Sequence, residues 1–126
     1  MPTKLLFPEL SYRIINCAFK VHNELGGGLP EAVYQNDLQH EFELQNILFT
    51  EQKFSNVMYK GKKIKRNYSD FLVHDQIIVE LKSTYRIIGS DYKQVKKDLI
   101  SVNKQLGTML HFGRQFLTHK RVLNLY

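Results

Sequence analysis

The sequence has few of the features that cross-link a small protein or anchor it in a membrane. Cys17 is the only cysteine among its 126 residues, so neither an internal disulfide nor a zinc site built from cysteines can form. No run of about 18 apolar residues occurs, and a membrane-spanning helix is therefore not expected. The opening residues, MPTKLLFPELS, contain too short and too polar an apolar stretch for a secretory signal. Together these absences predict a cytoplasmic protein in a reducing compartment.

Composition and charge are those of a globular protein with one core. Hydrophobic residues make up 43% and charged residues 24% of the chain, and the length predicts a single domain over residues 1–126. The formal net charge is +6 and the pI is near 9.4. A basic surface attracts polyanions such as nucleic acid, although many basic proteins bind none. The glycines are not followed by the lysine of a Walker-type phosphate loop, so ATP binding of that kind is not expected.

Hydrophobic periodicity predicts an α/β order of elements: two helices, three strands, one helix and two strands. Ser11 is the expected N-cap of the first helix, and Gly26 is expected in a left-handed conformation at its end. The consecutive apolar residues 77–79 are typical of a strand that is covered on both faces. The expected helices are 10–25, 30–45 and 91–103, and the expected strands are 48–59, 64–73, 76–82, 106–112 and 120–126.

Three charged residues interrupt the mostly apolar stretch YSDFLVHDQIIVELK, namely Asp70, Glu80 and Lys82. Glu80 and Lys82 are two residues apart on one strand, so they project from the same face. If Val73 pairs with Ile77, a three-residue loop joins the two strands and Asp70 lies opposite Glu80. A two-residue loop would instead send Glu80 to the other face, unless a bulge near Asp70 corrects the register.

Two interpretations of these charged residues stay open. Carboxylates held a few ångströms apart repel one another, and their burial is costly without a cation. A Mg²⁺ or Mn²⁺ ion would relieve both effects, because hard oxygen ligands suit these ions. Lys82 could then activate a water or stabilise phosphate charge during metal-assisted phosphodiester hydrolysis. The alternative is an ion pair between Lys82 and one carboxylate at a sheet edge.

Glu31 is a fourth candidate. It stands seven residues before the apolar Leu38, and this spacing places it on the inner stripe of the second helix. A carboxylate in a first helical turn is also explained by the helix dipole alone, whereas its inner position makes it a candidate ligand of the same metal. Tyr34 follows one turn later and is expected to pack with its hydroxyl at the rim, or to hold Glu31 in place.

A basic cluster surrounds the turn between the first two strands. It contains Lys60, Lys62, Lys63, Lys65 and Arg66. One interpretation is a solvated turn whose charges prevent edge pairing, and the other is an arm that contacts phosphates. No aromatic residues are interleaved with the charges, so stacking on bases is not expected there.

The motif GLPEAVY, residues 28–34, is similar to the G-x-x-E-x-x-Y signature of the GxxExxY protein family, which looks like a compact branch of the PD-(D/E)XK nuclease superfamily. The resemblance covers about residues 11–125 and includes VHNELG, IIVELK and LHFG. The signature alone is short. Its combination with D-x9-E-x-K makes the resemblance more specific.

The resemblance implies a restriction-endonuclease-like core, αβββαβ, with a mixed central sheet flanked by helices. It implies that Asp70 and Glu80 bind metal, that Glu31 contributes a ligand from its helix, and that Lys82 assists the nucleophile. Gln94 stands where related nucleases carry a glutamine on the helix after the Glu-x-Lys strand, and the resemblance implies that it is also catalytic.

This sequence departs from the family pattern at three positions. Ser69 and Gly27 stand where relatives often carry proline, and both are compatible with the backbone expected there. Asp98 replaces a tyrosine that often follows the glutamine by four residues, and this change weakens the assignment of Gln94. The acidic residues and the lysine of the core motif are all present.

These observations together predict a nuclease. We expect hydrolysis of phosphodiester bonds in nucleic acid, with DNA as the favoured substrate, Mg²⁺ or Mn²⁺ as cofactor and no membrane partner. The alternative, from a different class, is a non-catalytic module with the same fold that binds nucleic acid or protein. A homodimer would supply the two sites that cutting both strands commonly needs, although no residue demands one.

Overall fold

The computed structural model describes residues 6–125, except for the side chains of 52–58 and 63–69. Its elements are α1 (Pro8–Leu25), α2 (Glu31–Leu44), β1 (Phe49–Tyr59), β2 (Lys62–Val73), β3 (Ile77–Lys82), α3 (Gly89–Val102), β4 (Leu106–Phe112) and β5 (Leu117–Leu123). The strands form one sheet in the order β1-β2-β3-β4-β5. Only the β3–β4 pair is parallel among these strands. This mixed sheet with flanking helices confirms the α/β, restriction-endonuclease-like fold and the predicted order of elements.

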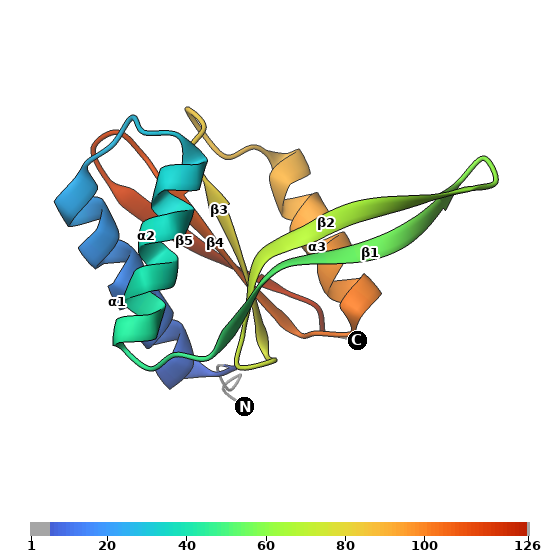
Figure 1. The fold of residues 1–126 in the computed structure, drawn as a ribbon, viewed down its shortest axis with the longest axis horizontal. Helices are drawn as coiled ribbons and strands as arrows, with labels where there is room; N and C mark the ends of the chain where they lie inside the picture. Colours follow the sequence, from blue (N-terminus) through green and yellow to red (C-terminus); the bar gives the residue numbers. More distant parts are fainter. Residues whose placement is uncertain (1–5, 126) are drawn as a thin grey trace.

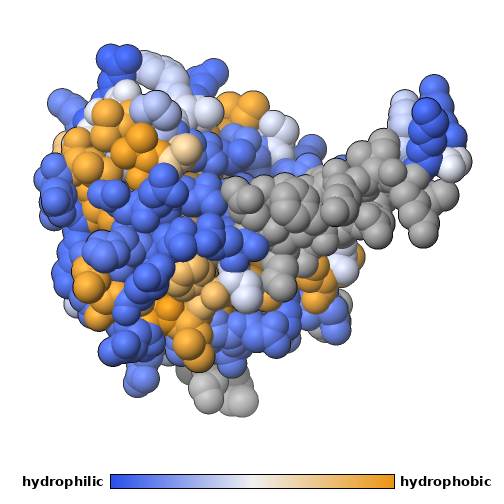
Figure 2. Space-filling model, in the orientation of Figure 1, coloured by the Kyte–Doolittle hydropathy of each residue, from blue (hydrophilic) through white to orange (hydrophobic). Residues whose placement is uncertain are grey.

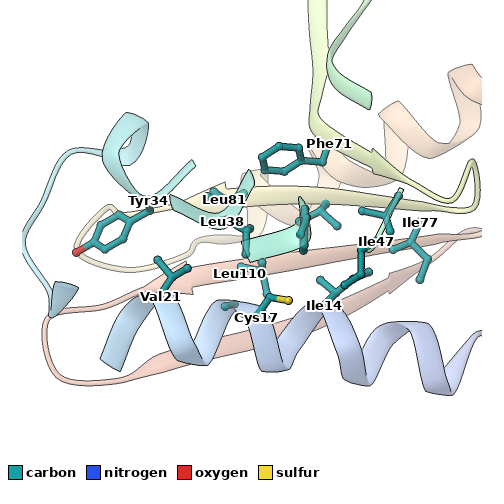
Figure 3. Close-up of a cluster of buried hydrophobic side chains, with 14 of the residues drawn as sticks. Ile14, Cys17, Val21, Tyr34, Leu38, Ile47, Phe71, Ile77, Leu81 and Leu110 are labelled. Carbon is teal, nitrogen blue, oxygen red and sulfur yellow. The ribbon is translucent and has the colours of Figure 1, made fainter. Parts of the chain in front are cut away.

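The helices cover both faces of the sheet (Figure 1). α1 and α2 pack on one face and enclose the larger apolar cluster, which includes Ile14, Leu38, Phe71, Leu81 and Leu110 (Figure 3). α3 connects the parallel strands β3 and β4, which require such a crossover, and covers the other face with a smaller cluster. As predicted for a strand covered on both faces, residues 77–79 are fully buried.

β1 and β2 extend beyond the sheet as a long two-stranded arm (Figure 1). β2 has 12 residues, but its pairing with β3 covers only the three pairs from Phe71↔Val79 to Val73↔Ile77. The tip of the arm, around Lys60 and Lys62, is exposed and hydrophilic (Figure 2). The other basic side chains of the predicted cluster, Lys63, Lys65 and Arg66, lie outside the described residues.

Several expected boundaries were wrong. α1 begins at Pro8, and Ser11 is not its N-cap: it is buried, and its hydroxyl accepts a hydrogen bond from Arg121 at 3.1 Å. Gly26 has a positive φ of 72°, but its ψ of −171° is extended rather than left-handed helical. The last strand is Leu117–Leu123 instead of 120–126, because a short turn lets Leu117 pair with Phe112 and enter the apolar cluster.

The helices of the described part of the chain include none that is long and apolar enough to cross a membrane.

Candidate active site

The site is built at the point where β2 leaves β3. Val73 pairs with Ile77, so the three-residue loop that the sequence allowed is the one that forms. Two of its residues, His74 and Asp75, have left-handed backbone angles, with φ of 51° and 56°. This register places Asp70, one residue beyond the last β2–β3 pair, on the same face as Glu80.

At this point the carboxylate of Asp70 accepts a backbone hydrogen bond that a neighbouring strand would otherwise accept. Its Oδ2 accepts a hydrogen bond from the backbone N–H of Leu81 at 2.7 Å. Beyond Val79, the described pairing gives β3 no β2 neighbour, and a buried N–H without an acceptor is costly. The carboxylate therefore satisfies a donor that the sheet no longer pairs, and it is held in place with only 6% of its surface exposed.

Asp70 and Glu80 form a crowded acidic pair. Burial raises the pKa of Glu80 to about 8, and the neighbouring Asp70 adds to this rise. Burial also raises the pKa of Asp70, against the opposing effects of the Leu81 N–H, a side-chain hydrogen bond with Glu80 and the charge of Lys82. The pKa of both carboxyl groups is therefore raised, as expected for two carboxylates that meet without a cation between them.

Lys82 lies on the same face as Glu80 and next to the start of α3. Its Nζ is 3.8 Å from Oδ1 of Asp91, while Oδ2 of Asp91 accepts the backbone N–H of Ile88 at 2.9 Å. The lysine lowers the pKa of Asp70 and Glu80, so its charge acts on both carboxylates. Lys82 is thus in an ion pair, as the alternative interpretation required, but its partner Asp91 was not among the expected residues.

Glu31 approaches the same group from the first residue of α2. Burial raises its pKa, Asp70 raises it further, and Lys82 opposes the rise. These electrostatic effects show that Glu31 lies near both residues. The four residues that the sequence singled out, Glu31, Asp70, Glu80 and Lys82, are therefore brought together.

Tyr34 holds the loop that leads to Glu31. Its side chain is fully buried and stacks on Phe112, with ring centroids 4.5 Å apart. Its hydroxyl donates to the carbonyl of Gly26 at 2.7 Å and accepts the N–H of Leu29 at 3.2 Å. Figure 3 shows this hydroxyl at the end of the apolar cluster, turned away from the other labelled side chains. Tyr34 thus packs at the rim and also fixes the approach to Glu31.

A sequence profile described as the PD-(D/E)XK nuclease superfamily matches residues 8–122. The chain belongs to the PD-(D/E)XK nuclease superfamily. Members of this superfamily generally act on nucleic acid and depend on a divalent metal. No curated protein matches the chain.

A solved structure titled "Crystal structure of SSO0001" is similar to this PD-(D/E)XK chain, with a TM-score of 0.57 and 14% sequence identity. The match covers 94% of this chain and 61% of that chain, so this chain spans less than two thirds of the length of that protein. At this identity the likeness shows the fold alone.

Gln94 is linked to the acidic group of this PD-(D/E)XK fold through Asp98. It is exposed on α3, and its Nε2 donates to Oδ1 of Asp98 at 2.9 Å. Asp98 is only 3% exposed, and its charge contributes to the raised pKa of Glu80. Sequence reasoning treated Asp98 only as a departure from the family pattern. Its spacing from Val95 and Val102 on the inner stripe of α3 was the signal that predicts burial.

Among the residues that the structure describes, no three histidine, cysteine or acidic side chains are arranged to hold a metal ion by themselves. The chemistry of the donor set nevertheless fits Mg²⁺ or Mn²⁺. The buried carboxylate of Asp70 and the half-buried carboxylate of Glu80 present hard oxygen atoms on one face. Such ions are commonly held by one or two carboxylates, several waters and substrate phosphate oxygens.

Proposed function

We propose that this protein is a metal-dependent nuclease that hydrolyses phosphodiester bonds, with DNA as its substrate. The observation that carries the proposal is the pair formed by buried Asp70 and half-buried Glu80, with Lys82 on the same face of the sheet. Such a pair is costly for a protein to maintain unless a cation or substrate makes use of it.

Asp70 and Glu80 would hold Mg²⁺ or Mn²⁺, and Glu31 would complete the ligand set directly or through a water. When bound, the ion supplies positive charge beside the scissile phosphate and lowers the pKa of a nearby water. Leu81 keeps Asp70 oriented through its backbone N–H.

Lys82 would act on the water or on the phosphate. An ammonium group has three donors and no acceptor, so it cannot ligate a metal. It can hydrogen-bond the attacking water or a non-bridging phosphate oxygen, where its charge stabilises the transition state. Its ion pair with Asp91 at 3.8 Å is partly exposed and longer than a good hydrogen bond, so the lysine can turn toward a substrate without a large loss.

Gln94 is a positioning residue in this proposal. Its amide holds Asp98, and Asp98 acts electrostatically on Glu80. The motif GLPEAVY at 28–34 supports membership of the GxxExxY branch, and its tyrosine, Tyr34, fixes the loop that leads to Glu31. A homodimer would allow two such sites to cut both strands of a duplex.

The proposal is tested by cleavage assays on single- and double-stranded DNA and RNA with Mg²⁺ or Mn²⁺. Asp70→Asn and Lys82→Ala should both abolish metal-dependent cleavage. Glu43→Gln and Lys93→Ala are matched controls, because both residues are exposed and should leave cleavage unchanged. Cleavage that is unchanged in both site variants would come from a contaminant. A wild-type protein that cuts no substrate would support the alternative, a non-catalytic binding module.

A further inference from the structure

Two cavities flank Tyr85 and Arg114 at one end of the sheet. One has a volume of about 260 Å³ and is lined by residues including Leu29, Thr84 and Tyr85. The other has a volume of about 550 Å³ and is lined by residues including Phe116. Tyr85 and Arg114 line both cavities. We call this area, defined by Tyr85, Arg114 and Phe116, the loop-end surface.

The loop-end surface adjoins the candidate active site through the chain itself. Tyr85 follows Lys82 by three residues, which at about 3.3–3.6 Å per residue keeps their Cα atoms within about 11 Å of one another. Gly28 and Leu29, which line the smaller cavity, directly precede the segment that brings Glu31 to the site. The loops that carry these residues lie together at the same end of the molecule in Figure 1.

Hydrogen bonds fix both walls of this surface. His111 Nε2 donates to the carbonyl of Thr84 at 2.7 Å, next to Tyr85. His22 Nε2 donates to the carbonyl of Gly113 at 2.6 Å, next to Arg114. A Cβ atom at Gly27 would lie 2.3 Å from the Cα of Arg114, so these two loops are in close backbone contact. The surface is therefore largely formed before any ligand binds.

The exposed side chains on this surface are aromatic and cationic. Tyr85 is 94% exposed and Phe116 is 71% exposed. Arg114, two residues before Phe116, is also exposed. Exposed aromatic rings beside an arginine are the combination that binds unpaired bases, by stacking on the rings and by contacts of the guanidinium with phosphate or with the base face. Duplex bases are already stacked and cannot use these rings.

We propose that the loop-end surface binds unpaired nucleotides of the substrate strand next to the bond that is cut. This inference rests on the proposed nuclease function and adds a substrate class, a nucleic acid with a single-stranded segment at the cleavage position. Tyr85 stacks on a base and Arg114 contacts the adjoining phosphate.

The test measures fluorescence anisotropy of labelled oligothymidylate, oligouridylate and a duplex of the same length in EDTA, which prevents metal-dependent cleavage. Tyr85→Ala should weaken binding of the single strands by about 5- to 150-fold, the range that loss of one stacked base produces, whereas Tyr85→Phe should bind like wild type. Arg114→Ala should weaken binding and lower the dependence of log affinity on log salt by about one. The two oligonucleotides distinguish DNA from RNA as the source of the unpaired base.

Tyr12→Ala is the matched control, because Tyr12 is also an exposed tyrosine, at 69%, and lies in the first turns of α1, which begins at the opposite end of the sheet (Figure 1). The inference is overturned if Tyr85→Ala binds single strands as wild type does, if wild type binds none, or if wild type prefers the duplex. Wild-type cleavage measured on the same preparation separates the two proposals. Tyr85-dependent binding without cleavage would remove only the nuclease, and cleavage without Tyr85-dependent binding would remove only this surface.

Discussion

The two halves of β3 have different neighbours and correspondingly different chemistry. Residues 77–79 pair with β2 on one side and β4 on the other, and all three are fully buried and apolar. Residues 80–82 pair with β4, while the described pairing with β2 has already ended. It is in this second half that Glu80 and Lys82 occur. The loss of a neighbouring strand opens a place where charged side chains can gather and where a buried carboxylate, Asp70, has a backbone donor to bind.

The comparison predicts opposite results for substitutions in the two halves. Side chains of the first half should determine stability and have little direct part in catalysis. Side chains of the second half should determine catalysis, and some should reduce stability when no metal is bound.

The largest effect is expected for Lys82→Ala in the second half. Loss of a group that stabilises transition-state charge or assists proton transfer typically lowers the rate by about 10²–10⁴-fold. Metal binding should persist, because the ammonium is not a ligand. Single-turnover cleavage and calorimetric Mn²⁺ titration measure the two properties. Equal loss of both would show that Lys82 supports the fold of the site rather than the chemistry.

In the first half, Ile78→Ala should lower the free energy of unfolding by about 2–5 kcal/mol. Ile78 is fully buried in the cluster between the sheet and α3, and the truncation leaves a cavity there. Urea denaturation measures the change. Ile100→Ala is the control, since Ile100 is 59% exposed on α3 and a surface change should stay within about 0.5 kcal/mol. Similar values for both variants would contradict the assigned role of the first half.

A bound metal ion should stabilise the folded protein through the carboxylates of Asp70 and Glu80. Saturating Mn²⁺ at about 100 times its Kd should add about 2.7 kcal/mol to the free energy of unfolding, seen as a rise in Tm. Asp70→Asn should remove this rise, whereas Glu43→Gln should keep it. Unchanged Tm values in wild type, with and without a nucleic-acid fragment, would exclude the proposed metal site and favour the Lys82–Asp91 ion pair as the whole role of the lysine.

The pH dependence of stability, measured in EDTA, should reveal the raised pKa of Glu80. Its pKa is about 8 in the folded protein, and in the unfolded chain it is near 4.5, the ordinary value of a glutamate side chain. Between these values the folded state keeps a proton that the unfolded state loses, so stability falls as the pH rises through this window. Glu80→Gln should therefore be more stable than wild type at pH 9, with a smaller difference at pH 5. Urea midpoints that change equally with pH in both proteins would contradict the raised pKa.

The smallest effect is expected for Tyr34→Phe, which tests how Glu31, the third carboxylate of the proposed site, is held near Asp70 and Glu80. The variant loses the hydrogen bond to the Gly26 carbonyl and leaves the Leu29 N–H without its acceptor, a change of about 1 kcal/mol in stability. Cleavage should fall more than stability alone explains, because the loop before Glu31 is loosened. Tyr92→Phe, on the half-buried face of α3, is a control for loss of a tyrosine hydroxyl.

Local sequence patterns determined most of the element order but left the register between β2 and β3 open. Periods of two and 3.6 residues identify strands and helices because each element must bury one face. Periodicity could not choose between the two- and three-residue loops after Val73, because residues 77–79 are apolar on both faces of the strand. Glu80 and Lys82 could be grouped from the sequence by their spacing, whereas the pairing of Val73 with Ile77, which adds Asp70 to them, is a finding of the structure.

The tertiary structure alone decided which distant residues join this group. Asp91 pairs with Lys82 because α3 begins beside the end of β3, and Asp98 acts on Glu80 because the inner stripe of α3 faces the sheet there. These arrangements arise from packing between elements that are far apart in the chain. Sequence periodicity shows which face of each element is apolar, but it does not show which residues of another element pack against that face.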